Sequence, residues 1–344
     1  MEGGLSLLKR ILIVHTGGTF GMLEKSGLWE PSSQNDLAAA VPELSQLATV
    51  HTVVPFVQDS AELTVDHINQ LASVIAGSRD RYDGFIVIHG TDTMAYSASA
   101  LSFMLLGLGK PVVFTGSQRP FMQIRTDARS NLINSVEIAM SGLTEIAIFF
   151  GNKLLRGNRT TKVSTWKFEA FDSPNFPMLG EAGMNITFNL YDVKNPALEA
   201  LSFQPFCHLS PLVSVVHLYP GLHREFLDCL LADASKAIVL VAYGAGNMSI
   251  ENGSGLLPFI TSAIHQGKLV AVTTQCQHGR VALHVYESAR KIRDLGVLSC
   301  MDMTLETAIM KLDYLLSKYP DEPETVRRLF ETNIAGELTD ERSS

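Results

Sequence analysis

Two short threonine-containing segments carry side chains that could attack a carbonyl carbon. They are His15-Thr16-Gly17-Gly18-Thr19 and His89-Gly90-Thr91-Asp92-Thr93, and each follows a run of apolar residues. A threonine hydroxyl becomes an effective nucleophile only when a base takes its proton. Glycines beside it allow backbone amides to approach a ligand closely. These residue types suit acyl transfer, although a strand-to-loop turn or a helix N-cap explains either segment taken alone.

A third segment, Arg156-Gly157-Asn158-Arg159-Thr160-Thr161-Lys162, contains a candidate base. It is basic in an otherwise acidic chain, and its default interpretation is a solvated charged patch. A lysine that a loop delivers into a crevice could instead accept a proton, if burial and nearby charge lower its pKa. Asp92 could then bind an ammonium group of a ligand. Each segment is a weak signal alone, so the argument depends on whether the fold brings them together.

The polar segments follow predicted strands. Ile11–Val14 precedes the first segment, Val50–Val57 precedes Asp59-Ser60, and Phe85–Ile88 precedes the second segment. In a doubly wound sheet, ligands bind beyond the carboxyl ends of the strands. The sequence therefore predicts that these three strand ends line one crevice.

Alternation of strands, loops and helices predicts an α/β fold. We expect a larger N-terminal domain with a doubly wound, mainly parallel sheet, and a smaller C-terminal α/β domain. The predicted bounds are 1–190 for the N-terminal catalytic domain, 191–210 for a linker and 211–344 for the C-terminal domain. Further strands are predicted over 112–114, 146–150, 213–218, 238–241 and 269–273, with extended loops or a hairpin over 151–183. Helices are predicted over 64–76, up to about 106, from about 127, and over about 304–317 and 323–333.

Composition narrows the class of protein. Of the 344 residues, 46% are hydrophobic and 18% charged, which excludes a disordered chain. The net charge of -8 argues against a nucleic-acid partner, because phosphate binding needs a basic surface. The sequence has no signal-peptide pattern and no apolar stretch long enough to span a membrane. Four cysteines without a CxxC pair favour a reduced compartment, and the ten histidines form no metal-binding motif. We therefore expect a cytoplasmic protein with no membrane partner and no metal.

Taken together, the motifs resemble those of the bacterial asparaginase/glutaminase family, and most closely its cytoplasmic type I L-asparaginase branch. The resemblance covers essentially the whole chain, and the combination of the first two segments is its most specific part. The matching residues are His15-Thr16-Gly17-Gly18-Thr19-Phe20-Gly21-Met22, Asp59-Ser60, Asp83-Gly84-Phe85, His89-Gly90-Thr91-Asp92-Thr93-Met94-Ala95, Val112-Val113-Phe114-Thr115-Gly116-Ser117-Gln118, the Arg156 to Lys162 segment, Tyr243-Gly244-Ala245-Gly246-Asn247, Thr274-Gln275-Cys276 and Asp302-Met303-Thr304.

The resemblance implies an L-asparaginase, which hydrolyses L-asparagine to L-aspartate and ammonia through an acyl-enzyme and without a cofactor. Thr16 is then the nucleophile that attacks the side-chain amide carbon. Thr91, Asp92 and Lys162 form a second catalytic cluster, in which neutral Lys162 next to Thr91 serves as the base. The Asp92 carboxylate holds the α-ammonium group of the substrate.

The same resemblance implies a substrate-binding set. Ser60 is expected to hydrogen-bond the α-carboxylate of the substrate. Backbone amides near Gly18 and Thr91 are expected to stabilise the oxyanion, a role that commonly carries much of the rate enhancement. Asp59 and Gly90 complete the set around these groups.

The sequence also departs from the family pattern. Many type I relatives continue the Asp-Ser pair with serine and aspartate, whereas Ala61 and Glu62 follow here, so one substrate hydrogen bond could be missing. Other members carry a tyrosine in the mobile loop after TGGT, and the corresponding loop, Leu23–Pro31, has none. Tyr286 is the candidate for this phenol, with a packed core tyrosine as the alternative.

Two other functions stay open at this point. An asparaginase-like subunit of an archaeal-type glutamyl-tRNA amidotransferase would carry an extra N-terminal domain, which we do not expect here because the first predicted strand starts at Ile11. The acidic balance also disfavours tRNA. A catalytically inactive amino-acid sensor would not need to keep Thr16 and the second cluster. Because the family assembles as dimers or tetramers, the resemblance implies a homodimer or a homotetramer.

Overall fold

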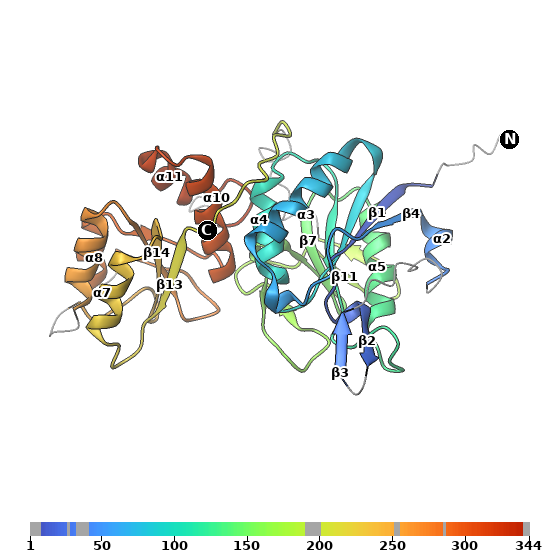
Figure 1. Cartoon of the computed structure of the whole chain (residues 1–344), viewed down its shortest axis with the longest axis horizontal. Coiled ribbons are helices and arrows are strands. Elements are labelled where there is room, and N and C mark those ends of the chain that lie inside the picture. The colour runs from blue at the N-terminus through green and yellow to red at the C-terminus, as the bar shows by residue number, and fades with distance from the viewer. Residues whose placement is uncertain are drawn as a thin grey trace. The chain divides into compact units, whose positions relative to one another are not determined.

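The computed structural model describes residues 8–25, 28–31, 41–189, 201–250, 255–284 and 287–339 (Figure 1). The chain forms two compact units, Met1–Cys207 and His208–Ser344. Within the described residues, the first unit contains an eight-stranded sheet and the second a four-stranded sheet. The predicted α/β fold with the larger sheet in the N-terminal half is confirmed. The unit boundary falls inside the predicted linker 191–210; since residues 191–200 are outside the described part, the linker stays a prediction.

The sheet of the first unit has the strand order β12-β11-β8-β7-β6-β5-β1-β4. Five neighbouring strands are parallel: β4 (Thr49–Val53), β1 (Arg10–His15), β5 (Gly84–Ile88), β6 (Val112–Thr115) and β7 (Ile146–Phe150). The other three pair antiparallel with their neighbours: β8 (Lys153–Arg156), β11 (Gly180–Ala182) and β12 (Ile186–Phe188). The central strands are unbroken apolar runs because both faces of the sheet are covered.

The order of the parallel strands reverses at β1. The chain passes from β1 to β4 on one side of β1, and then returns to β5 on the other side. Connections that leave neighbouring strands in opposite directions open a crevice at their carboxyl ends, and open α/β sheets bind ligands there. Thr16, which directly follows β1, lies at this switch point.

Helices cover both faces of the first sheet (Figure 1). Leu132 and Val136 of one helix pack in a buried cluster with Ile11, Ile13 and Ile86, so alternate residues of the strands face this helix. The helices are α2 (Leu44–Leu47), α3 (Val65–Ser78), α4 (Met94–Met104) and α5 (Ala128–Met140). Thr64 is the N-cap residue of α3, as predicted, and its backbone N–H donates to His67 Nδ1 at 3.1 Å.

Two predicted elements of the first unit differ from the structure. The strand predicted over Val50–Val57 ends at Val53, because Pro55 has no N–H for the sheet ladder. The predicted loop Leu23–Pro31 contains an antiparallel pair of short strands, β2 (Met22–Lys25) and β3 (Leu28–Pro31). The extended and hairpin structure predicted over 151–183 is confirmed. Along the chain, β9 (Thr161–Lys162) and β10 (Phe171–Asp172) follow β8 and precede β11, and they pair antiparallel with each other.

The second unit has the strand order β13-β14-β15-β16, all parallel and in chain order. The strands are β13 (Val213–His217), β14 (Ala237–Ala242), β15 (Leu269–Thr274) and β16 (Leu298–Ser299). The helices are α7 (Arg224–Ala232), α8 (Leu256–His265), α9 (Glu287–Asp294), α10 (Leu305–Lys318) and α11 (Pro323–Phe330). Three strands and two terminal helices match the prediction, and β16 was not predicted because its two residues give no periodic signal. Without a reversal in strand order, the described part of this sheet has no switch point.

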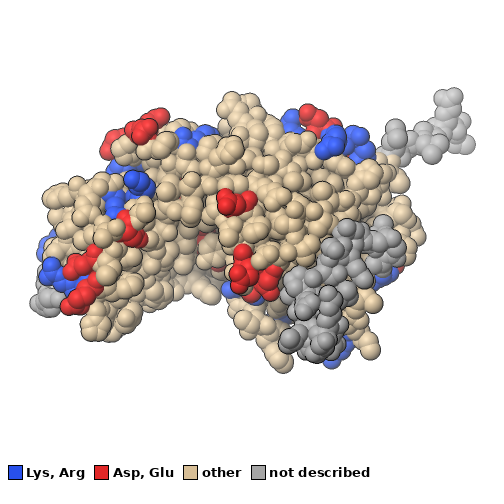
Figure 2. Space-filling view, viewed as in Figure 1, with Lys and Arg blue, Asp and Glu red and all other residues tan. Residues whose placement is uncertain are grey.

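Two surface properties follow from the described residues. None of their helices combines the length and the apolar character needed to cross a membrane. On the face displayed in Figure 2, acidic and basic side chains of the described residues are interspersed, without a continuous basic surface. Binding of a nucleic-acid backbone requires a continuous basic surface.

Candidate active site

Thr16 is held rigidly where the chain leaves β1. Its backbone N–H donates to the Ile88 carbonyl at 3.0 Å, and its Oγ1 hydroxyl donates to the same carbonyl at 2.9 Å. The Gln58 N–H donates to the Thr16 carbonyl at 3.0 Å. The residue is buried, with 1% of its surface exposed. Gln58, in the segment after β4, and Ile88, at the end of β5, therefore hold Thr16 from both sides.

The glycines around Thr16 allow three chain segments to touch. Gly17 and Gly18 have φ angles of 104° and 75°, which L side chains rarely adopt. A Cβ on Gly18 would lie 2.4 Å from the Gly90 Cα, and a Cβ on Gly90 would lie 2.5 Å from the Ser60 Oγ. Only glycine at both positions permits this approach, so the structure places Gly18, Gly90 and Ser60 in direct contact.

The second predicted cluster is also assembled. Lys162 Nζ donates to Thr91 Oγ1 at 2.8 Å and contacts Asp92 Oδ1 at 2.6 Å, across about 70 residues of sequence. Thr91 is buried, the Lys162 side chain is 19% exposed and the Asp92 side chain is 60% exposed. A carboxylate that is both paired and open to solvent can still bind a cationic group of a ligand.

Ser60 connects this cluster to the end of β4. Its Oγ accepts the Asp92 N–H at 3.2 Å, and its carbonyl accepts the Thr93 hydroxyl at 2.8 Å. Because the Ser60 oxygen acts as an acceptor towards Asp92, its own hydrogen is available for donation to a ligand. Asp59 is the N-cap of the short helix that follows, where its Oδ1 accepts the Ala61 N–H at 2.9 Å. Its carboxylate therefore shapes the Ser60 turn.

A hairpin carries Lys162 to the site. Lys162 on β9 lies opposite Phe171 on β10, and Phe171 packs edge to face on Phe150 with ring centroids 5.2 Å apart. The interpretation of the basic segment as a solvated patch is wrong for its two arginines. Arg156 is 3% exposed and pairs with Glu145 at 2.6 Å, and Arg159 is 2% exposed. The arginines therefore stabilise the loop that presents the lysine.

The histidines before the two glycine motifs are neutral. Burial lowers the pKa of both His15 and His89 to about 4. His89 Nδ1 lies 2.7 Å from the Gly90 carbonyl, and since a carbonyl only accepts, Nδ1 carries the proton. His89 Nε2 then accepts the Ser97 hydroxyl at 2.9 Å. His89 thus positions the Gly90 turn, a role that the sequence reasoning missed although a histidine adjoins each glycine motif.

Two of the predicted site features have a different outcome. The Gly18 N–H donates to the Gln58 carbonyl at 3.0 Å, so this amide is already occupied and cannot also stabilise an oxyanion in this conformation. Position 18 requires glycine because it packs closely on Gly90. Tyr286 lies outside the described residues. Among the described residues, no group of three His, Cys, Asp or Glu side chains gathers as a metal site.

Comparison with protein families finds a matching family model for each half of the chain. Residues 10–194 match the model "Asparaginase, N-terminal", and residues 212–330 match "Glutaminase/Asparaginase C-terminal domain". The chain belongs to the asparaginase/glutaminase family. Its two structural units correspond to the two family domains, and the resemblance based on the sequence motifs is confirmed.

Individual members of the asparaginase/glutaminase family are similar over nearly the whole chain. L-asparaginase 1 of Escherichia coli K12 is 38% identical over 96% of this chain and 98% of its own length. The crystal structure of L-asparaginase I from Vibrio cholerae superposes with a TM-score of 0.86 at 37% identity, covering 97% of this chain and 100% of that one. A glutamyl-tRNA(Gln) amidotransferase subunit of Pyrococcus abyssi is 34% identical, over 96% of this chain and 77% of that protein.

Proposed function

We propose that this protein is an amidohydrolase that converts L-asparagine to L-aspartate and ammonia. The observation that carries the proposal is the Thr91–Lys162–Asp92 cluster, whose Thr91 and Asp92 follow β5, the strand paired with β1 directly before Thr16. Membership of the family and the 38% identity to an L-asparaginase over almost the full length support it.

In this proposal Thr16 is the nucleophile. Its hydroxyl hydrogen is directed to the Ile88 carbonyl, which cannot take a proton at neutral pH. The side chain must therefore turn away from that carbonyl before the oxygen attacks the substrate amide carbon. The Thr16 backbone N–H remains on the Ile88 carbonyl, so the carbonyl keeps a hydrogen bond when the hydroxyl leaves.

Lys162 acts as the proton acceptor through Thr91. A carboxylate oxygen of Asp92 lies 2.6 Å from Nζ, so the two side chains form an ion pair. A substrate α-ammonium group at Asp92 would neutralise that carboxylate. Binding of the correct substrate would then release the lysine to accept a proton, which couples recognition to activation.

The remaining contacts orient the substrate. The Ser60 hydroxyl, which keeps its hydrogen, donates to the α-carboxylate, and the backbone amide of Thr91 is the candidate for stabilising the oxyanion. With both α-groups of the substrate held, the side-chain amide is directed towards Thr16. Water then hydrolyses the acyl-enzyme, and no step needs a cofactor.

The proposal extends to the setting of the enzyme. A cytoplasmic location and a homodimer or homotetramer are proposed from the type I character of the motifs. Light scattering coupled to size exclusion measures the assembly directly. A monomer at micromolar concentration would contradict this part and leave the chemistry untouched.

Release of ammonia is the test of the function. Purified protein is incubated in parallel with L-asparagine, L-glutamine and D-asparagine, without tRNA or any acceptor. We expect rapid release from L-asparagine and background release from the Thr16→Ala variant. An amidotransferase subunit would need its partner and acceptor for efficient turnover, and a sensor would bind L-asparagine without releasing ammonia. Either result would replace the proposal.

A further inference from the structure

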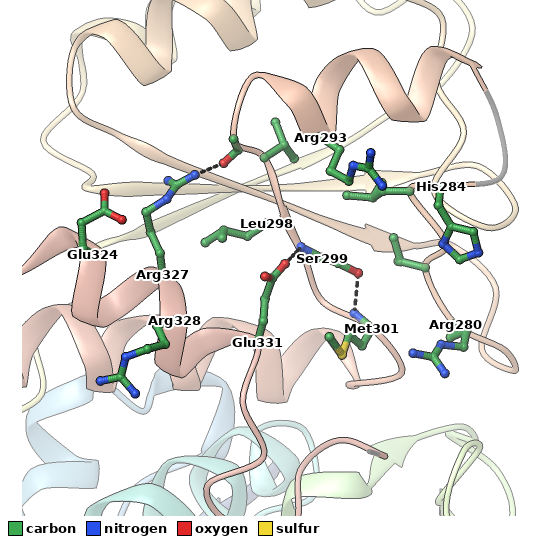
Figure 3. A pocket seen from close by; sticks show the side chains of 14 residues that line it. Arg280, His284, Arg293, Leu298, Ser299, Met301, Glu324, Arg327, Arg328 and Glu331 are labelled. Carbon is green, nitrogen blue, oxygen red and sulfur yellow. Dashed lines mark hydrogen bonds between the residues drawn. The ribbon is translucent and has the colours of Figure 1, made fainter. Parts of the chain in front are cut away.

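A cavity of about 480 Å³ lies in the second unit, and none of the residues that line it is among those assigned to catalysis (Figure 3). Its walls come from four parts of the chain: the edge strand β16 with its flanking residues, α11, α9 through Arg293, and the segment 280–284 that follows β15. Cavities of roughly 300–1,000 Å³ are typical of sites for ligands of cofactor or drug size. We refer to it as the arginine cavity.

The arginine cavity concentrates positive charge in an acidic protein. Its cationic residues are Arg280, Arg293, Arg327 and Arg328, and His284 also lines it. Figure 3 shows the α11 arginines at one side and the other three residues opposite, with Leu298 between them. Four arginines and two glutamates line the cavity, which leaves an excess of two positive charges although the chain as a whole carries -8.

Only part of this charge serves the fold. Arg327 donates to the Gly296 carbonyl beside β16, and Glu331 accepts the Ser299 N–H at 2.8 Å. These two side chains therefore hold α11 against the edge of the sheet. Arg328, in contrast, makes no ion pair or side-chain hydrogen bond with the described residues. Arg293 contacts only the neighbouring Asp294 at 3.4 Å, with both side chains more than half exposed, and such pairs contribute little.

The floor of the arginine cavity is apolar. Val281, Leu283, Val297 and Leu298 line it, and each is between 4% and 6% exposed. A free inorganic anion would leave this surface in contact with water. An apolar floor below cationic walls instead fits a ligand that has a flat, weakly polar body and an anionic group.

We infer that the arginine cavity binds a phosphorylated small molecule of about the size of a nucleoside monophosphate. A phosphate monoester carries nearly two negative charges at neutral pH, which matches the excess charge of the cavity. Guanidinium groups bind phosphate oxygens through paired hydrogen bonds, and the base and sugar can cover the apolar floor. Glu324 provides an acceptor for hydroxyl or amino hydrogens of the ligand and disfavours a longer polyanion.

Calorimetric titration of the full-length protein tests the inference, with adenosine monophosphate as the probe. We expect a dissociation constant below about 1 mM, and binding at least about tenfold weaker for both adenosine and inorganic phosphate. Arg293→Gln and Arg328→Gln are exposed changes, and each is expected to weaken binding about tenfold or more. Arg224→Gln is the matched control, because this arginine of the same unit lies on α7 in an exposed pair with Asp228.

Each other outcome overturns the inference. Absence of heat with the monophosphate excludes the proposed ligand class. Equal binding of adenosine would mean that the arginines do not recognise the anion, and equal binding of phosphate would remove the role of the apolar floor. If both cavity variants bind like the Arg224→Gln control, the ligand site lies elsewhere. The thermal unfolding midpoint of each variant confirms that the protein titrated is folded.

Discussion

Each unit of the chain holds a lysine against a carboxylate, and the two ion pairs have opposite surroundings. In the first unit, Lys162 and Asp92 have side chains 19% and 60% exposed. In the second unit, Lys311 pairs with Glu337, and both side chains are fully buried. Lys311 also donates to the carbonyls of Phe330 and Thr332, at 2.7 Å each. The first pair can exchange partners with a ligand, and the second has its bonding satisfied by the fold.

The sheet topologies explain where each pair occurs. In the first unit the strand order reverses at β1, and a reversal of this kind opens a crevice at the carboxyl ends of the strands. In the second unit the strands follow one another in chain order, and the buried lysine joins α10 to the segment after α11. We therefore propose that a similar residue pair supports chemistry in one unit and stability in the other, depending on its access to water.

The largest effect is expected at the switch point. Thr16→Ala should lower ammonia release from L-asparagine by about a thousandfold or more, because it removes the nucleophile. The fold should survive, since the Thr16 N–H still satisfies the Ile88 carbonyl. Thr115→Val is the control, as Thr115 is a buried threonine at the end of β6 whose hydroxyl has no partner among the described residues. Near-normal turnover of Thr16→Ala would remove the nucleophile assignment.

Loss of the partly buried Lys162 should affect turnover and leave stability nearly unchanged. Lys162→Met is expected to slow turnover by roughly 100- to 10,000-fold, the usual contribution of a positioned acid or base, while substrate binding is mostly kept. Lys162→Arg should not restore turnover, because a guanidinium does not give up its proton. Lys153→Met provides the control for charge, since Lys153 pairs with Asp172 on the same hairpin region. A fully active Lys162→Arg variant would point to a purely electrostatic role.

Loss of the buried lysine should have the reverse effect. Lys311→Met leaves the Glu337 carboxylate uncompensated in the core and should lower the free energy of unfolding by about 3–5 kcal/mol. Burial already lowers the pKa of Lys311, although Glu337 opposes the shift. Adding Glu337→Gln should recover much of the loss, because the amide oxygen can still accept the Ala335 N–H. Chemical denaturation measures both; an unchanged midpoint for Lys311→Met would contradict the contrast between the two pairs.

Substrate length tests how rigidly the first unit defines its site. If Asp92 and Ser60 hold both α-groups, the extra methylene of L-glutamine moves its carbonyl away from Thr16. A misplacement of about 1 Å can cost ~100-fold in rate, so kcat/KM for L-glutamine should be lower by about that factor. Ala61, which is exposed, is the position most able to relax this preference. Comparable kcat/KM values for the two amides would mean that the site does not fix the α-groups.

The last prediction concerns the pH dependence of stability in the second unit. Burial raises the pKa of Asp313 to about 7, against the opposing hydrogen bonds from Leu212 and Val213. The folded state then binds a proton that the unfolded state releases near pH 4, so this group destabilises the fold increasingly as pH rises from about 4 to about 7. The unfolding midpoint of Asp313→Asn should therefore rise relative to that of wild type as the pH increases over that range. Above about pH 7 the difference between the two midpoints should stay constant. A difference between Asp313→Asn and wild type that does not change with pH would contradict the assignment.

Much of this molecule follows from local sequence. Apolar runs such as Ile11–Val14 predict buried strands, and Thr64 before the periodic segment predicts the start of α3; both are observed. The motifs at Thr16 and Thr91 predict polar strand ends, because glycine and hydroxyl residues after an apolar run cannot extend the core. Hydrophobic periodicity and capping are properties of neighbouring residues, so the sequence alone reveals them.

Other features depend on which strands become neighbours. Only the return of the chain past β1 places Ser60 against Gly90, and only the β9–β10 hairpin brings Lys162 to Thr91 across about 70 residues. The burial of Arg156, and the occupation of the Gly18 amide by Gln58, also depend on this pairing. Strand order is set by the packing of the whole sheet and has no signature in local periodicity. The residue types of the site were therefore predictable from the sequence, whereas their partners were decided by the tertiary structure.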